Sequence, residues 1–289
     1  MKKIMLAITL TLNGIILFYA CKKDKDTVVD FDTQTARDNA LAEGSYNDVN
    51  NIILQALENG SVSTYRSGVS QNNTLSTCAT VTINPDSAGN GGNAIIDFGP
   101  NYCQCSGAIC SDRRYRRGRI LVNYTGAYRD SGTVITTTFD NYFVGMDTTY
   151  MYKVDGTKTV TNNGTNSSGN LSFSINVTGQ LTNVAGAVMP WNSTRTREWT
   201  SGASTLPDWR DDEYVITGSA SGTNFEGTSF TVVITSGLVI KLNCAYITQG
   251  VFELTPSGRA TRTFDYGNGT CDALATLTVN GSSFEINLR

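Results

Sequence analysis

Apolar and polar residues alternate in short stretches over most of the chain beyond Leu75. Alternation with a period of two is typical of a strand with one buried face, and the connections between these stretches are rich in Gly, Asn, Asp and Ser. No stretch is a continuous apolar run of the kind that parallel sheets covered on both faces require. The pattern therefore predicts a mainly β protein, built as a large antiparallel β-sandwich or meander.

The candidate strands share this alternation and have turn residues at both ends. In 149–161, the predicted apolar face consists of Tyr150, Tyr152, Val154 and Val160, and the polar face of Lys153, Asp155, Thr157, Thr159 and Thr161. The full set of predicted strands is 79–83, 93–98, 119–125, 133–143, 149–161, 171–178, 193–200, 213–219, 228–235, 238–242, 246–254, 259–266, 273–279 and 283–288. We assign residues 75–289 to a single all-β domain.

A short helical segment precedes this domain, over residues 35–60. Its apolar residues recur at spacings of three and four, which is the period of one helix face. Gly44 interrupts the pattern, and Asn59-Gly60 ends it. We expect a helical hairpin, or one helix broken at Gly44, that packs on the β domain; an amphipathic helix that binds a partner is the alternative.

A motif that occurs twice indicates internal pseudo-repeats. The segment from Cys78 to Cys103 and the segment from Cys244 to Cys271 both begin Cys-Ala-x-[Val/Ile]-Thr and carry Asp-aromatic-Gly near the end. We expect each Asp-aromatic-Gly to close a strand, with the aromatic ring packed inward, the Asp side chain capping the turn and the Gly at positive φ. The repeat indicates how the fold is built and identifies no catalytic or binding chemistry.

The N-terminus has the features of an export signal. Residues 1–20 place two lysines before an apolar run that is short for a membrane span, and the run ends Leu17-Phe18-Tyr19-Ala20-Cys21. This end resembles the lipobox of bacterial lipoproteins, with Phe18 at the usual leucine position. The resemblance implies that Cys21 is lipidated and that residues 21–34 form a tether to the membrane.

Cysteine parity agrees with export, because seven cysteines leave six to pair once Cys21 carries lipid. The duplication favours Cys78–Cys103 and Cys244–Cys271, which leaves Cys105 with Cys110, although six cysteines allow about 15 connectivities. Metal binding by Cys103, Cys105 and Cys110 is the rival, but their spacing is unusual for zinc. We expect disulfides and no metal site.

Composition excludes several kinds of chemistry. The chain has no histidine, which removes Ser-His-Asp and Cys-His nucleophiles and every metal site that uses imidazole. A net charge of −3 gives no general attraction to nucleic acid. We predict no cofactor.

Two clusters of arginine and aromatic residues are the candidate binding sites. Several arginines close together in the sequence can bind phosphate or carboxylate groups, and tyrosine or tryptophan can stack on a sugar. The alternative is an exposed strand face on which the arginines pair with acids across the sheet. The first cluster consists of Arg113, Arg114, Tyr115, Arg116 and Arg117, and the second of Arg195, Arg197 and Trp199 beside Trp191.

Carboxylates offer a weaker hint of catalysis. The stretch Asp211-Asp212-Glu213, close to Trp209, could supply one carboxyl of a glycan hydrolase, with Asp140 or Glu198 as its partner. Glycoside hydrolysis needs two carboxyls held on either side of the bond, and the sequence does not show that these residues meet. We therefore assign no catalytic residue and predict that the protein is not an enzyme.

Motifs such as TVTNNG, STRTREW, ITGSASGTN and DYGNGTCD make the mature chain similar to the uncharacterised, cysteine-containing cell-envelope lipoproteins of Bacteroidota. The resemblance implies a lipid anchor in the outer membrane, at the cell surface or on the periplasmic face. It brings no activity with it. We expect non-enzymatic binding of a glycan, envelope polymer or protein partner; the alternatives are a structural accessory subunit of an outer-membrane complex and a carboxylate-dependent glycan hydrolase.

Overall fold

The computed structural model describes residues 30, 32–58, 79–87, 91–104, 114–205 and 210–288. Within these ranges one antiparallel sheet follows the order of the chain, from β1 to β14, and only the two-residue β3 lies off this path, paired with β4. The strands are β1 (Thr80–Pro85), β2 (Gly92–Asp97), β3 (Cys103–Gln104), β4 (Tyr115–Tyr124), β5 (Val134–Gly145), β6 (Tyr152–Thr165), β7 (Leu171–Thr182), β8 (Val188–Ser201), β9 (Glu213–Thr223), β10 (Ser229–Lys241), β11 (Ile247–Pro256), β12 (Arg262–Asn268), β13 (Leu274–Val279) and β14 (Ser282–Asn287).

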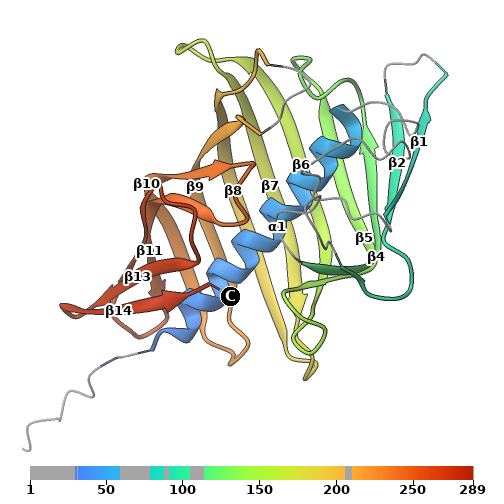
Figure 1. The fold of residues 1–289 in the computed structure, drawn as a ribbon. Helices are drawn as coiled ribbons and strands as arrows, with labels where there is room; N and C mark the ends of the chain where they lie inside the picture. Colours follow the sequence, from blue (N-terminus) through green and yellow to red (C-terminus); the bar gives the residue numbers. More distant parts are fainter. Residues whose placement is uncertain are drawn as a thin grey trace, which may run out of the picture.

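The sheet curves around a single long helix, α1 (Gln34–Glu58) (Figure 1). The helix crosses the strands at a slant on their inner face, with β1 and β2 beyond one side of it and β13 and β14 beyond the other (Figure 1). This arrangement is a meander, so the predicted mainly β, antiparallel fold with a preceding helical segment is confirmed.

The predicted break at Gly44 is wrong, because α1 runs through Gly44 without interruption. A glycine inside a helix costs only about 1 kcal/mol relative to alanine, and packing on a sheet easily offsets that cost. The helix packs on its own domain through apolar residues that recur along it. They are Ala36, Ala42, Val49, Ile52, Ile53, Leu54 and Ala56, all buried in the core.

Alternation located the strands well and missed two irregularities. The predicted stretches 228–235 and 238–242 form the single strand β10, whose pairing shifts register between Val233 and Leu238. Such a bulge breaks the alternation and therefore looks like a gap between two strands. Tyr150, predicted to lie on an apolar strand face, is 63% exposed and precedes the start of β6.

The first copy of the Asp-aromatic-Gly motif closes β2 as predicted, whereas the second lies near the end of β12, which continues to Asn268. In the first copy, Asp97 accepts a hydrogen bond from the Gly99 amide at 2.7 Å, and in the second Asp265 accepts one from Gly267 at 2.8 Å. Both glycines have positive φ, 80° and 95°. The aromatic residues between them, Phe98 and Tyr266, are buried.

The predicted disulfide between Cys244 and Cys271 is present. Cys103 is disulfide-bonded as well, whereas Cys78, Cys105 and Cys110 lie outside the described residues, so the rest of the predicted pairing stays a prediction. The signal peptide, Cys21 and most of the tether are also outside them. Among the described residues, no helix has the length and apolar character needed to span a membrane.

Candidate binding pocket

Charged and polar side chains on the inner face of the sheet hold α1 in place. Arg116 donates a hydrogen bond through Nη2 to the Asp48 carboxylate at 2.6 Å, and the Arg195 guanidinium donates to the Glu43 carboxylate. The buried amine of Lys158 donates to the backbone carbonyl of Tyr46 at 2.7 Å. Charge-assisted bonds of this kind fix both the position and the rotation of the helix.

Tyr46 and Trp191 add an aromatic tie at the middle of the helix. Their rings stack with centroids 5.4 Å apart, and Trp191 also donates its indole N–H to Asn39 at 3.0 Å. The Tyr46 hydroxyl donates to the Asp155 carbonyl at 2.8 Å, and it fits because the neighbouring position is Gly179. A Cβ atom at Gly179 would lie 2.0 Å from this hydroxyl oxygen.

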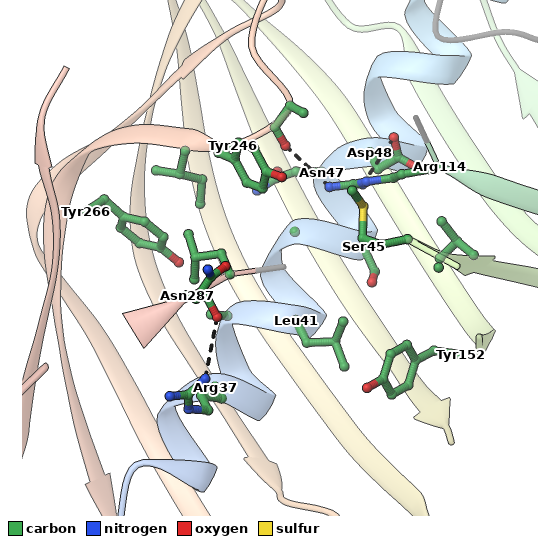
Figure 2. Close-up of a pocket in the computed structure, with 18 of the residues that line it drawn as sticks. Arg37, Leu41, Ser45, Asn47, Asp48, Arg114, Tyr152, Tyr246, Tyr266 and Asn287 are labelled. Carbon is green, nitrogen blue, oxygen red and sulfur yellow. Dashed lines mark hydrogen bonds and ion pairs between the residues drawn. The ribbon is translucent and has the colours of Figure 1, made fainter. Parts of the chain in front are cut away.

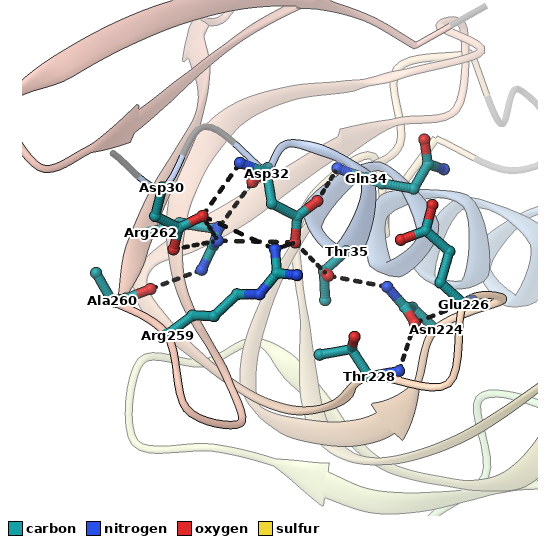
Figure 3. A network of polar contacts seen from close by, with 10 residues as sticks. All are labelled: Asp30, Asp32, Gln34, Thr35, Asn224, Glu226, Thr228, Arg259, Ala260 and Arg262. Carbon is teal, nitrogen blue, oxygen red and sulfur yellow. Dashed lines mark hydrogen bonds and ion pairs between the residues drawn. The ribbon is translucent and has the colours of Figure 1, made fainter. Parts of the chain in front are cut away.

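A second network anchors the start of α1 (Figure 3). Arg262, fully buried, binds both carboxylate oxygens of Asp30 at 2.7 Å, while Arg259 pairs with Asp32 at 2.7 Å. On the other side of the helix start, Asn224 donates to the Thr35 hydroxyl at 3.0 Å. The first helical turn is therefore tied to the loop before β12 and to the β9–β10 turn.

The opposite face of α1 lines a pocket of about 380 Å³ (Figure 2). Its floor is the helix stripe Gln34, Arg37, Asp38, Leu41, Gly44, Ser45, Asp48 and Asn51. One wall comes from the end of β5 and the loop to β6, and the other from the β10–β11 loop and the end of β14. The volume falls in the range of small-molecule sites, roughly 300–1,000 Å³.

Gly44 makes room in the floor of this pocket. A Cβ atom built at Gly44 would have no other atom within 4 Å. Any larger side chain at this position would therefore extend into open space between the walls. The glycine that misled the helix prediction is thus a feature of the pocket.

Two hydrogen bonds span the pocket, one from the helix and one from the residue before β4, and Figure 2 shows both. Arg37 donates to the Asn287 carbonyl at 3.4 Å, and Arg114 donates to the Ala245 carbonyl at 3.3 Å. Arg114 also lies 3.3 Å from a carboxylate oxygen of Asp48. These contacts place one arginine near each end of the pocket.

Two buried polar groups beside the pocket lack a partner within the described residues. They are the hydroxyl of Tyr266 and the amide nitrogen of Asn47. A buried donor without an acceptor costs roughly 1–3 kcal/mol, so native proteins normally satisfy such groups with protein, water or ligand. A ligand that carries hydroxyl or carbonyl oxygens could supply the missing bonds.

Burial changes the acid–base behaviour of Asp38, which lies on the helix stripe. Desolvation raises the pKa of its carboxyl, against hydrogen bonds from Gln34 and the Phe225 amide, which lower it. Both carboxylate oxygens are occupied, by Gln34 at 2.7 Å and by Phe225 at 3.2 Å. Burial also raises the pKa of the Tyr152 hydroxyl, with smaller contributions from Asp38 and Asp147.

The structure divides the first predicted arginine cluster between two faces of β4. Arg116 is 1% exposed and Arg114 is largely buried, and both point toward Asp48. Arg117 faces the outer side and stacks on Phe143, with Cζ 3.8 Å from the ring centroid. Tyr115 is half-buried, and Arg113 lies outside the described residues. The predicted exposure is therefore wrong for Arg114 and Arg116, and Arg114 lines the pocket; the predicted binding role of the cluster stays a prediction.

The predicted exposure of the second patch is also wrong, because its residues lie inside the molecule. Arg195, Arg197 and Trp199 are 4%, 2% and 1% exposed. They share the inner face of β8 with Met189 and Trp191. All of these positions are separated by multiples of two residues, which places them on one strand face and was the missed sign of their burial. Arginine side chains are usually exposed, and this general tendency led to the prediction of a surface patch. Glu43 on α1 instead provides a buried partner for Arg195.

The carboxylates considered for hydrolysis lie away from the pocket. Asp140 pairs with Arg119 at 3.4 Å, Glu198 accepts a bond from Asn170 at 2.8 Å, and Asp211 accepts one from Thr205 at 2.8 Å. These residues, with Asp212 and Glu213, are not among those that line the pocket, and Trp209 lies outside the described residues. The described residues form no cluster of acids or cysteines that could hold a metal ion.

No known protein family, curated protein or solved structure is significantly similar to this chain.

Proposed function

We propose that this protein is a non-enzymatic binding protein of the cell envelope, anchored through Cys21, and that it holds part of a glycan in the pocket above α1. The observation that carries the proposal is the pocket itself, because it combines aromatic walls with buried hydrogen-bonding groups that have no partner among the described residues. Its place on the open side of a curved sheet leaves it accessible past the two walls.

The side chains of the pocket suit a sugar better than a purely apolar ligand. Its tyrosines are Tyr150, Tyr152, Tyr246 and Tyr266. Tyrosine offers a flat apolar ring to one face of a sugar and a hydroxyl to its edge. The amide, hydroxyl and carboxylate groups of Gln34, Ser45, Asn47 and Asp147 can exchange hydrogen bonds with sugar hydroxyls.

The acids of the pocket support binding more than proton transfer. Asp48 is held by Arg114 and Arg116, and both oxygens of Asp38 accept hydrogen bonds from Gln34 and Phe225. Carboxylates bound in this way keep a fixed position and have little freedom to exchange protons with a substrate.

The test uses the full mature chain, extracted in mild detergent, on an array of envelope polysaccharides and their oligosaccharides. Wild type is compared with Gly44→Leu, which fills the pocket, and with Gly44→Ala, which adds one methyl group in open space. We expect Gly44→Leu to lose at least tenfold in affinity for every glycan that wild type binds, while Gly44→Ala stays within about twofold.

Other results would support the alternatives. If no glycan binds, or if Gly44→Leu binds as well as wild type, the glycan proposal is wrong. A membrane protein that copurifies in equal amount would favour the accessory subunit instead. Shortened oligosaccharides after incubation with wild type would favour the hydrolase.

A further inference from the structure

Arg197 is a buried cation that forms no ion pair with any acid among the described residues. Its side chain is 2% exposed, and its Nε and Nη2 atoms have no hydrogen-bond partner in the part of the chain that the structure describes. Its guanidinium stacks on Tyr214, with Cζ 3.5 Å from the ring centroid. Stacking of this kind stabilises a desolvated guanidinium, but it leaves the N–H edge of the group unsatisfied.

Two more cations lie next to Arg197 on the inner face of the sheet. Arg195 precedes it by two residues on the same face of β8, and its Nη1 atom also lacks a partner within the described ranges. Lys158, on β6, is completely buried, and Arg197 is the charged neighbour that lowers its pKa most, after desolvation. These three side chains occupy the space between the sheet and α1.

The acids of the helix do not balance these charges. Asp48 pairs with Arg114 and Arg116, and Glu43 pairs with Arg195; both carboxylates also raise the pKa of Lys158, but no ion pair with Arg197 occurs among the described residues. The nearby amide nitrogen of Asn50, on the helix face that turns toward the sheet, is a further buried donor without a partner in the described chain. Since a buried charge is costly unless it is paired, this interior has more donors than acceptors and more positive than negative charge.

We propose that a small anion, of the size of chloride or formate, binds beneath α1 between the N–H edge of Arg197, Nη1 of Arg195 and the amine of Lys158. Such an anion would neutralise the excess positive charge and accept the missing hydrogen bonds. It would stabilise the contact between α1 and the sheet, and none of the three cations that would hold it lines the pocket.

The test compares thermal unfolding of the full mature chain in sodium chloride, sodium formate and sodium gluconate at one ionic strength, since gluconate is too large for this interior. We expect Tm in chloride or formate to exceed that in gluconate, and to rise by roughly 3–5 °C for each tenfold increase in anion above its dissociation constant. Arg197→Met should remove this dependence. Arg119→Met, at an exposed arginine on β4, should keep it.

Crystals soaked in sodium bromide give a second readout, which does not depend on how stable the variants are. An anomalous peak within hydrogen-bonding distance of Arg197 is expected. Equal Tm values in all three salts, an anion effect that persists in Arg197→Met, or ordered water in place of bromide would each overturn the proposal.

Discussion

The two faces of α1 differ in what they contact and in how fully their polar groups are satisfied. The face toward the sheet carries Asn39, Glu43 and Tyr46, which bind Trp191, Arg195 and backbone carbonyls of the sheet. The outward face carries Leu41, Gly44 and Ser45, which border open space. The comparison shows that one helix can serve as a fixed structural element on one side and as the floor of a binding site on the other.

The difference matters because a rigid floor favours binding. A ligand pays less ordering entropy when the groups that contact it are already held in place. The hydrogen bonds that hold α1 to the sheet, from Arg262 near the start of the helix to Arg116 at Asp48, supply that rigidity. Substitutions on the two faces should therefore have different consequences, for stability on the inner face and for binding on the outer face.

The largest expected effect follows from breaking the pair between Glu43 and Arg195. Glu43→Ala would leave a buried guanidinium without its carboxylate and should lower the free energy of unfolding by about 3–5 kcal/mol. Urea denaturation measures this loss. The double variant Glu43→Ala/Arg195→Met should be less destabilised than Glu43→Ala alone; equal losses would mean that the pair is not what fixes the helix.

A smaller effect concerns the buried amine of Lys158. Desolvation, and then the charge of Arg197, hold its pKa well below the ordinary 10.5. Between the lowered pKa and 10.5, the unfolded chain therefore binds one more proton than the folded protein, so the free energy of unfolding should rise with pH by up to about 1.4 kcal/mol per pH unit.

Urea denaturation of wild type and Lys158→Met at pH 7, 8 and 9, in gluconate buffer without small anions, isolates this contribution. The free energy of unfolding of wild type, minus that of the variant, should increase from pH 7 to pH 9. A constant difference across this range would contradict a depressed pKa for Lys158.

The smallest effect is expected on the outer face. Gly44→Ala should stabilise the protein by roughly 0.5–1 kcal/mol, because alanine reduces the conformational freedom of the unfolded chain and meets no atom within 4 Å. Thermal unfolding measures the change. A loss of stability would mean that the space above Gly44 is closed in solution.

Much of the fold could be predicted from the sequence, because alternation reports directly on which strand face is buried. It located the strands, and the duplicated motif predicted the contacts of Asp97 and Asp265 with the glycines that follow them. It could not show that α1 supplies acids to the inner face of the sheet. Glu43 and Arg195 are 152 residues apart, so no local pattern links them.

The pocket was equally beyond prediction. Its residues come from the helix, from the ends and connecting loops of β5–β6 and β10–β11, from β12 and from the last strand, and each segment taken alone has an ordinary pattern. The predicted arginine clusters failed for a related reason. Residue type suggested exposure, while strand position, shared with Trp191 on β8, required burial.

The most direct test of the division between the two faces is hydrogen–deuterium exchange of the mature protein with and without the glycan that binds best on the array. The account predicts slower exchange in the β5–β6 loop, the β10–β11 loop and the end of β14, with the inner ties of α1 unchanged. Protection confined to the outer face of the sheet, or faster exchange of α1 on binding, would contradict it.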